Sequence, residues 1–283
     1  MIGALELGLC SWSLHQVEEL PLRQAMTRLG LRVLHLALGP IAELPESEQT
    51  RVIAAYKMSP LKISAGMIGF PGENYATLET IRATGGLVPD ATAQERIGHV
   101  MACARIAHQM GLSMVSTHAG FIPSAADKPA FEKLLARIGQ VTDAFAPLGL
   151  TLLFETGQET AEVLAAFLNA LGRKNVGANF DPANMVLYGK GDPVAAVRML
   201  GTRIRHVHAK DAKLHVPAPT NPAAWCGVEV PLGQGDAKLR EVVAALKDVG
   251  YRGPLVIERE AGEDRAADVR TGIAFLQSAI GAA

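Results

Sequence analysis

The chain has 283 residues, of which 49% are hydrophobic, and its 27 Lys and Arg residues stand against 28 Asp and Glu residues for a net charge of −1. This length is typical of one eight-fold α/β barrel, and the apolar content can supply a large core, so we expect residues 1–283 to form a single domain. The neutral balance excludes a global positive field that would hold a nucleic-acid backbone, which favours small neutral or mildly charged partners.

The cysteines and the N-terminal segment predict a cytoplasmic protein. The chain has three cysteines, Cys10, Cys103 and Cys226, which is an odd number, and their spacing is irregular. This pattern indicates reduced thiols rather than a disulfide framework. The first residues lack the basic segment and the apolar core of a secretion signal, and no apolar run reaches the roughly 18 residues of a membrane span. We therefore expect no membrane partner, whereas a homo-oligomer is compatible with the sequence.

Short apolar runs alternate with longer segments of helical periodicity along the chain. The expected strands are 5–10, 32–38, 61–68, 113–119, 150–155, 176–181, 204–210 and 254–258. The expected helices lie near 20–29, 46–58, 92–110, 128–147, 160–171, 193–200, 236–249 and 264–279. Eight such strand and helix units predict a closed parallel barrel, the (β/α)8 TIM barrel of the α/β class.

Two helix starts and two long connections add detail to this prediction. Asp192 followed by Pro193 is typical of a helix cap with proline in the first turn, and Thr160 precedes an apolar-periodic segment. The connections at roughly 67–91 and 211–235 follow the carboxyl ends of strands and are longer than a barrel needs. We expect both to line or cover an active site.

Four predicted strands end in a side chain that can bind a metal ion, namely Glu155, Asp181, His208 and Glu258. The carboxyl ends of barrel strands meet at one face, so these four side chains are expected to converge. One such carboxylate is usually a cap or an ion-pair partner, but four on consecutive strands are improbable by chance. Three carboxylates and one imidazole suit Mn²⁺ first, with Mg²⁺, Co²⁺ or Zn²⁺ as alternatives. The residual charge of about −1 is better tolerated beside a neutral sugar than beside a phosphodiester.

Four sequence segments resemble one group of enzymes. They are LLFETGQET, NFDPANMVLYGKGDP, HVHAKDA and GPLVIERE. The chain resembles the sugar isomerase and epimerase superfamily with xylose-isomerase-like barrels, which includes ketose 3-epimerases, inosose dehydratases and apurinic endonucleases. The resemblance implies metal ligation by Glu155, Asp181, His208 and Glu258, with Glu155 and Glu258 as the acid and base.

Strand parity leaves two ligand assignments open. His206, His208 and Lys210 share one face of their strand, and Glu258 and Glu260 pose the same question. His208 lies nearer the strand end, and the HxHxxD pattern of the superfamily also favours the second histidine. His206 is then either a support for the ligands or a residue that fills the barrel.

Several further residues are candidates for substrate binding. Asn184 occupies a position where epimerases and apurinic endonucleases of this superfamily commonly carry histidine, and an amide is a poor second-metal ligand, so one metal ion is expected. His118 ends a strand and either contacts the substrate, orients Glu155 or has only a structural role.

Lys210 and Trp225 complete the candidates. Lys210 either polarises a carbonyl and stabilises an enediolate or forms a solvated surface pair with Asp211. Trp225, in the second long connection, either stacks on a sugar ring or anchors the loop. Trp12 and Phe70 lie near other strand ends, where they form a pocket wall or pack in the upper barrel.

These observations predict a metal-dependent sugar isomerase or epimerase that removes a proton next to the carbonyl of a keto-sugar or sugar derivative. A lyase, such as a dehydratase of the inosose type or an eliminase on an oxidised sugar, would begin with the same proton abstraction and is the main alternative. A hydrolase like the apurinic endonucleases is disfavoured by the net charge and by Asn184.

Overall fold

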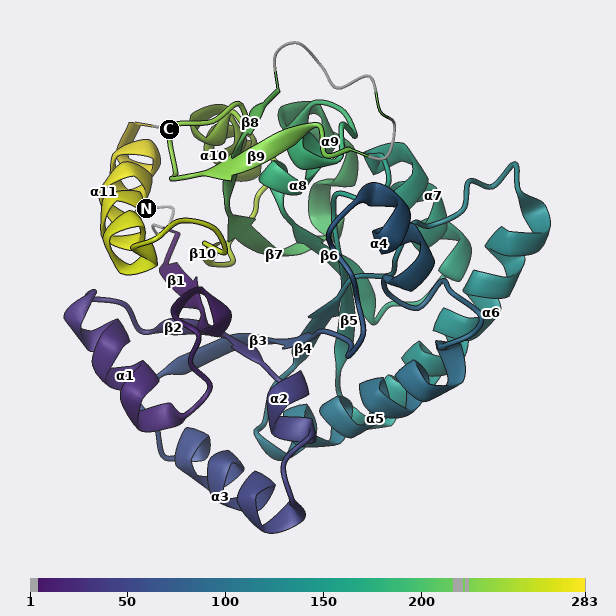
Figure 1. Ribbon diagram of the computed structural model, residues 1–283, viewed down its shortest axis with the longest axis horizontal. Helices are drawn as coiled ribbons and strands as arrows, with labels where there is room; N and C mark the ends of the chain where they lie inside the picture. The colour runs from purple at the N-terminus through teal and green to yellow at the C-terminus, as the bar shows by residue number, and fades with distance from the viewer. Residues whose placement is uncertain (1–4, 216–220, 222–223, 283) are drawn as a thin grey trace.

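A closed barrel of eight parallel strands forms the centre of the protein (Figure 1). The computed structural model describes residues 5–215, 221 and 224–282. The barrel strands, in the order in which they pair, are β1 (Leu7–Cys10), β10 (Leu255–Ile257), β7 (Ile204–Ala209), β6 (Val176–Phe180), β5 (Thr151–Glu155), β4 (Met114–Thr117), β3 (Lys62–Ile68) and β2 (Val33–Ala37), which pairs with β1. The predicted (β/α)8 TIM barrel is confirmed, and each observed strand lies within its predicted range.

Eight helices surround the barrel. They are α1 (Glu19–Arg28), α3 (Glu46–Lys57), α5 (Ala93–Gln109), α6 (Lys128–Phe145), α7 (Ala161–Leu171), α9 (Pro193–Leu200), α10 (Leu239–Asp248) and α11 (Arg265–Ala282). Short 3-10 turns lie at Ser11–Leu14, Ala146–Leu148 and Gly201–Arg203. Among the described helices, none is both long and apolar enough to cross a membrane.

The helix starts follow local side-chain chemistry. Thr160 and Asp192 each accept a hydrogen bond from the backbone N–H of the third residue that follows, as predicted. The prediction of a helix over 236–249 was wrong at its start, because Lys238 has a left-handed backbone with φ of 53° and α10 begins only at Leu239.

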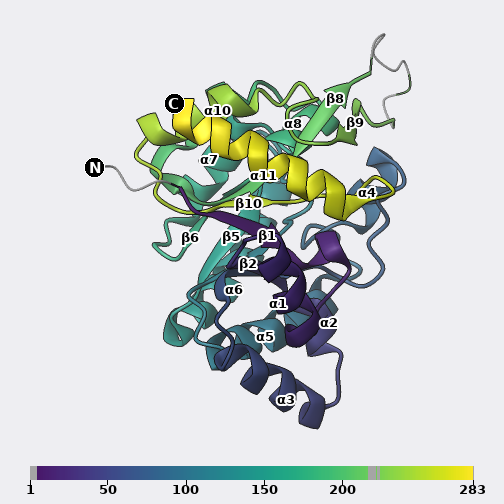
Figure 2. The same cartoon turned by 90° about the vertical axis from the view of Figure 1, so that its left-hand side faces the viewer.

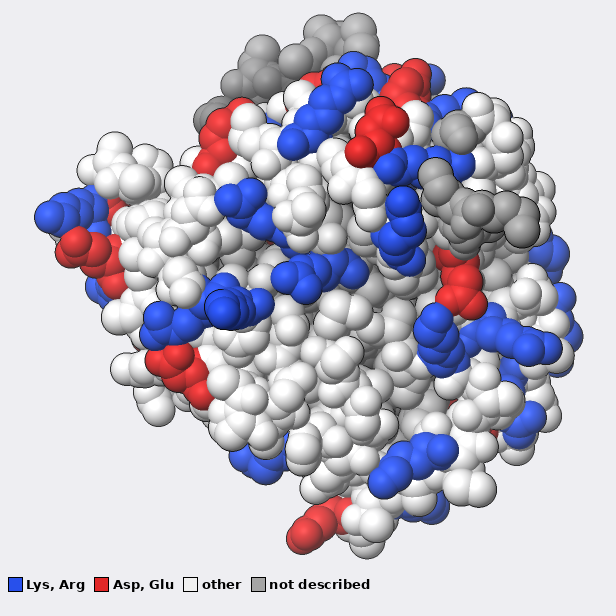
Figure 3. Space-filling model, turned by 180° about the vertical axis from the view of Figure 1, so that it is seen from behind, with Lys and Arg blue, Asp and Glu red and all other residues white. Residues whose placement is uncertain are grey.

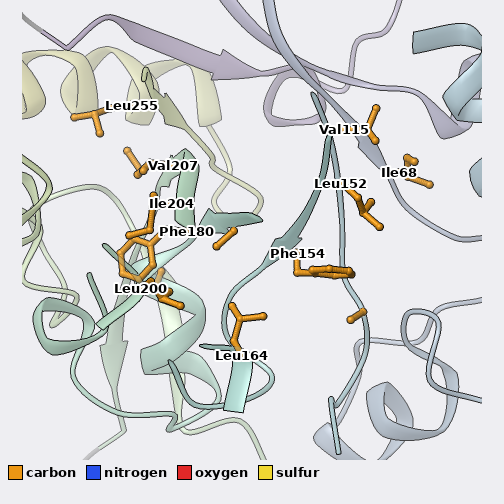
Figure 4. Packing of buried hydrophobic residues seen from close by; sticks show 14 of the residues in the cluster. Ile68, Val115, Leu152, Phe154, Leu164, Phe180, Leu200, Ile204, Val207 and Leu255 are labelled. Atoms are coloured by element: carbon orange, nitrogen blue, oxygen red, sulfur yellow. The ribbon is translucent and has the colours of Figure 1, made fainter. Parts of the chain in front are cut away.

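The main apolar core lies between the strands and the outer helices. Figure 4 shows Phe180 of β6 beside Leu200 of α9, and the ring centroid of Phe154 of β5 lies 5.9 Å from that of Phe167 of α7. All four side chains are buried. Because side chains alternate along a strand, the outward position of Phe154 directs Glu155 into the barrel.

The connections that follow β2, β3, β6 and β7 contain elements that the sequence did not predict. They are α2 (Gly39–Ala42), α4 (Leu78–Thr84), α8 (Pro182–Leu187) and the antiparallel pair β8 (Asp211–Leu214) and β9 (Gly227–Val230). Residues 216–220 and 222–223 of the second predicted connection lie outside the described residues. In Figure 2 the β8–β9 hairpin and α4 lie on the side opposite to the N-terminus, which places them over the carboxyl ends of the strands. Figure 3 shows the molecule from behind the view of Figure 1, where Lys and Arg side chains are spread over the surface and several lie beside Asp or Glu side chains.

Candidate metal centre and active site

Four side chains from consecutive strand ends converge in the structure. Glu155, Asp181, His208 and Glu258 are all buried, and each offers one ligand atom within 4.8 Å of the other three. Glu155 ends β5 and Asp181 directly follows β6, whereas His208 lies in β7 and Glu258 directly follows β10. The parallel register of these strands therefore builds the cluster, and its donor set can hold a divalent cation.

Glu155 is held by two amides. Asn179 Nδ2 donates to Oε2 at 3.2 Å, and Asn184 Nδ2 donates to Oε1 at 3.0 Å. His118 Nε2 lies 3.6 Å from Oε1. Although burial alone raises the pKa of Glu155, the imidazoles of His118 and His208 outweigh it, and the pKa lies below its usual value. The side chain is therefore a fixed carboxylate.

Asp181 has one oxygen in use and one without a partner. Its Oδ1 caps α8 by accepting hydrogen bonds from the backbone N–H groups of Ala183 at 2.8 Å and Asn184 at 3.1 Å. Its buried Oδ2 makes no hydrogen bond among the described residues, and Lys210 Nζ lies 4.0 Å away. Burial raises the pKa of Asp181 well above its usual value, and Glu258 and Glu155 add to this effect. A cation beside Oδ2 would offset that cost, so the residues fit a bound metal ion.

Glu258 lies between an indole and an ammonium group. Its Oε1 accepts from Trp12 Nε1 at 2.7 Å, and its Oε2 accepts from Lys210 Nζ at 2.9 Å. Burial raises the pKa of Glu258, but the charge of Lys210, with that of His208, lowers it well below its usual value. Glu258 is consequently an ionised carboxylate with fixed orientation.

Lys210 is a buried residue, so the alternative of a solvated pair with Asp211 is excluded. Their exposed fractions are 4% and 2%. Besides Glu258, Lys210 Nζ donates to Glu260 Oε2 at 2.5 Å, and the side chain of Glu260 is 50% exposed. Glu260 therefore lies at the rim and outside the four-residue cluster.

Asp211 accepts hydrogen bonds from the backbone N–H groups of Gly233 and Gly235, both at 2.9 Å, and so anchors the loop after β9.

The two histidines of β7 have different surroundings. His208 Nδ1 lies 3.4 Å from both Glu155 Oε1 and Glu258 Oε2. His206 instead contacts Asn179 Oδ1 through Nδ1 at 2.9 Å and Ser64 Oγ through Nε2 at 2.9 Å. His208 is thus the imidazole that faces the carboxylates. Burial lowers the pKa of His208, but Glu258 and other neighbours raise it well above the usual value, so this position favours positive charge.

Sequence reasoning missed two residues that contact the cluster. Asn179 joins His206 to Glu155, and His35 Nδ1 lies 2.8 Å from His208 Nε2. Both are polar residues inside otherwise apolar strand segments, VGANF and VLHLA. That interruption was the available signal, because a buried polar side chain in a strand requires a hydrogen-bonding partner.

A cavity of about 1110 Å³ opens onto the cluster. Its aromatic lining residues are Trp12, Phe70, Tyr75, Tyr188 and Trp225. Its charged lining residues are Lys210 and six glutamates, Glu43, Glu73, Glu155, Glu229, Glu258 and Glu260. His118 and Asn184 also line it, so the cavity brings all the predicted substrate-binding side chains to one space.

Trp225 contacts two segments of the cavity wall. Its ring lies 5.1 Å from that of Tyr188 at an interplanar angle of 37°, and its Nε1 donates to the Ala76 carbonyl at 3.3 Å. Trp225 therefore anchors its loop against the connection after β3 and also lines the cavity.

The fold and the cluster together define a barrel with a carboxylate and histidine centre at the carboxyl ends of its strands. Residues 79–279 match the xylose isomerase-like TIM barrel family. The chain belongs to that family.

Relatives and solved structures agree with this assignment. The chain is 34% identical over 133 residues to the uncharacterized protein YfiH of Bacillus subtilis, an alignment that covers 42% of each protein. It is 25% identical over 177 residues to an inosose dehydratase of Geobacillus thermodenitrificans, covering 54% of this chain and 59% of that protein. The chain thus spans about half the length of these relatives.

Two solved structures superpose on nearly the whole chain. A xylose isomerase domain protein from Planctomyces limnophilus has a TM-score of 0.84 at 29% identity and covers 98% of this chain and 96% of its own. A D-psicose 3-epimerase from Clostridium cellulolyticum H10 has a TM-score of 0.71 at 14% identity, covering 98% and 99%, which shows a shared fold.

Proposed function

We propose that the protein is a divalent-metal-dependent isomerase or epimerase that removes a proton next to the carbonyl of a keto-sugar or sugar derivative. The observation that carries the proposal is the buried cluster of three carboxylates and one imidazole at the base of the cavity, with Asp181 Oδ2 lacking a hydrogen-bond partner among the described residues. We propose one ion per chain, most readily Mn²⁺, held by Glu155, Asp181, His208 and Glu258.

The proposed chemistry divides between the ion and the two glutamates. A bound divalent ion would polarise the substrate carbonyl and stabilise negative charge on its oxygen. Glu258 receives the proton from the carbon next to the carbonyl. Glu155, after taking up a proton from solvent, delivers it to the other face of the same carbon. Both side chains line the cavity, and hydrogen bonds from Trp12 and Asn184 hold their orientations.

The charge of the cavity supports an uncharged substrate. Six glutamates line it, whereas Lys210 is the one Lys or Arg among its described lining residues and is already paired with Glu258 and Glu260. A phosphate or carboxylate group would meet like charges on the cavity wall without an unpaired Lys or Arg side chain among the described lining residues to bind it. A sugar with only hydroxyl and carbonyl groups avoids that repulsion.

The size and lining of the cavity support a substrate larger than a single sugar ring. Its volume of about 1110 Å³ lies slightly above the usual range of about 300–1,000 Å³ for small-molecule sites. Tyr188 and Trp225 supply an aromatic wall on which the apolar face of a ring can pack. A glycoside with a keto group on its sugar fits both features.

A lyase is the second candidate function. Lys210 places an ammonium group 2.9 Å from Glu258, where it can give a proton to a departing hydroxyl after Glu258 has taken the proton from carbon. The 25% identity to an inosose dehydratase agrees with this alternative. A hydrolase of the apurinic-endonuclease type is less compatible, because Asn184 directs its amide to Glu155 and the cavity lining is acidic.

Proton exchange in D₂O tests the proposal even where the product has not been identified. The protein is loaded with Mn²⁺ and incubated with keto-sugars, 3-keto-glycosides and inososes, and deuterium at carbon is measured by mass spectrometry and NMR. We expect incorporation next to the carbonyl in at least one uncharged substrate. Loss of water or an alcohol would assign the lyase, whereas a panel without exchange or turnover would refute α-proton chemistry.

A further inference from the structure

Beneath the metal-binding cluster, a buried chain of hydrogen-bonding groups runs from β4 through β2 to His208. His35 Nδ1 lies 2.8 Å from His208 Nε2, and His35 Nε2 lies 3.0 Å from Ser116 Oγ. Ser116 Oγ is in turn 3.1 Å from Met67 Sδ. We propose that His35 and Ser116 are positioning residues that hold the Nε2 proton of His208 and so direct Nδ1 of His208 at the metal ion.

The direction of the hydrogen bonds follows from the last group in the chain. A thioether sulfur has no proton to donate, so the Ser116 hydroxyl donates to Met67 Sδ. The Ser116 oxygen then accepts from His35 Nε2, which leaves His35 Nδ1 as an unprotonated acceptor in the neutral ring. His208 Nε2 consequently donates to His35 Nδ1.

Burial supports a single tautomer for His35. The side chain has no exposed surface, and its ring centroid lies 4.6 Å from that of His206 and 5.0 Å from that of His208. A second proton on His35 would put an unpaired charge among imidazoles and turn Nδ1–H against the Nε2–H of His208. Ser116 is also fully buried, so water does not compete for its hydroxyl.

The hydrogen-bonded chain of Met67, Ser116 and His35, here called the relay, matters because both nitrogens of His208 can bind a metal ion. With Nε2 engaged by His35, the other ring nitrogen is Nδ1, which lies 3.4 Å from Asn179 Nδ2 and 3.4 Å from both Glu155 Oε1 and Glu258 Oε2. Without an acceptor at His35, the proton can move to Nδ1 and the ring can turn, which removes the ligand from the cluster. The inference rests on the proposed function in one respect, which is that His208 binds a metal ion.

Two variants and one control test the relay. His35→Leu removes the acceptor, Ser116→Ala removes the group that orients it, and Leu36→Ala creates a defect at a fully buried neighbour in the same strand that takes no part in the relay. Mn²⁺ affinity is measured by the electron paramagnetic resonance signal of the free ion. We expect His35→Leu to raise the Kd by about 10–100-fold, Ser116→Ala to raise it less, and Leu36→Ala to leave it near the wild-type value.

The tautomer itself is read from long-range ¹⁵N–¹H spectra of metal-free protein labelled at histidine. The His35 signals are identified by their loss in His35→Leu, and we expect His35 to carry its proton on Nε2. Ser116→Ala should shift that population toward Nδ1, an effect that a merely structural role would not produce. A His35 proton on Nδ1 in the wild-type protein, or equal Kd values for His35→Leu and Leu36→Ala, would overturn the inference.

The two readouts separate this inference from the proposed function. Wild-type protein that shows the expected His35 tautomer but binds none of Mn²⁺, Mg²⁺, Co²⁺ and Zn²⁺ would refute the metal-dependent function, together with any role of His35 in directing His208 at an ion, and would support only the inferred direction of the hydrogen bonds. Wild-type protein that binds Mn²⁺ tightly, with no loss in His35→Leu, would refute the relay and leave the function standing.

Discussion

Replacing Glu258 with glutamine separates the two roles that we propose for its carboxylate. Oε1 accepts from Trp12 Nε1 at 2.7 Å and Oε2 accepts from Lys210 Nζ at 2.9 Å. A glutamine offers one carbonyl oxygen, so its amide group must face the other donor. The side chain keeps one oxygen that can coordinate a metal ion, but it has lost the basic group.

The structure sets the size of the two expected effects. In the variant the glutamine amide group faces a hydrogen-bond donor, and Lys210 keeps only Glu260 as a carboxylate partner. Together these two changes should lower the free energy of unfolding by about 1–3 kcal/mol. For a domain of this length the melting temperature should fall by several degrees. Loss of the base should slow turnover and solvent deuterium exchange by about 10² or more, equivalent to at least about 2.7 kcal/mol of activation free energy.

Glu260→Gln is the matched control for Glu258→Gln. It also removes a carboxylate partner of Lys210, but Glu260 lies outside the metal-binding cluster. Deuterium exchange, Mn²⁺ content and thermal unfolding are measured for both variants. We expect exchange to remain within a few-fold of wild type in Glu260→Gln. Wild-type exchange in a metal-loaded Glu258→Gln protein would refute the reasoning and make Glu155 or Lys210 the residue to test as the proton carrier.

Three further predictions concern the metal ion, the substrate and the stability of the fold. His208→Ala should sharply lower the metal content measured by elemental analysis, and His206→Ala should lower it less, because the hydrogen bonds of His206 go to Asn179 and Ser64 and not to the carboxylates of the cluster. The reverse order would identify His206 as the ligand. Trp225→Ala should lower kcat/KM by about five- to thirty-fold, because a stacking contact of about 1–2 kcal/mol is lost, and the metal content should not change. Unchanged kinetics across the substrate panel would show that Trp225 is only a loop anchor. Burial raises the pKa of Glu159 to about 8, above the ordinary value of 4.5 that applies in the unfolded chain, so Glu159 should reduce stability progressively as pH rises from about 4.5 to 8. Glu159→Gln should therefore gain on the order of a few kcal/mol over wild type between pH 5 and pH 8 in denaturant unfolding, and a gain independent of pH would contradict this assignment.

Local sequence patterns determined the barrel and the position of its reactive end. Strands and helices differ in apolar periodicity, and this difference is visible within each segment, whatever its neighbours are. Because parallel strands present their carboxyl ends at one face, Glu155, Asp181 and Glu258 could be expected to meet there. The short elements α4 and the β8–β9 hairpin escaped prediction, because a few residues at the mouth carry too little periodicity.

Only the tertiary structure decided how the side chains at that end are used. His206 and His208 have the same strand parity, yet one ring contacts Asn179 and Ser64 while the other faces two carboxylates. The sequence left Lys210 either as a residue that polarises a carbonyl or as a surface charge, and in the structure it is buried against Glu258. These differences depend on strand register across the barrel and on chains of hydrogen bonds between residues far apart in sequence, which no local pattern encodes.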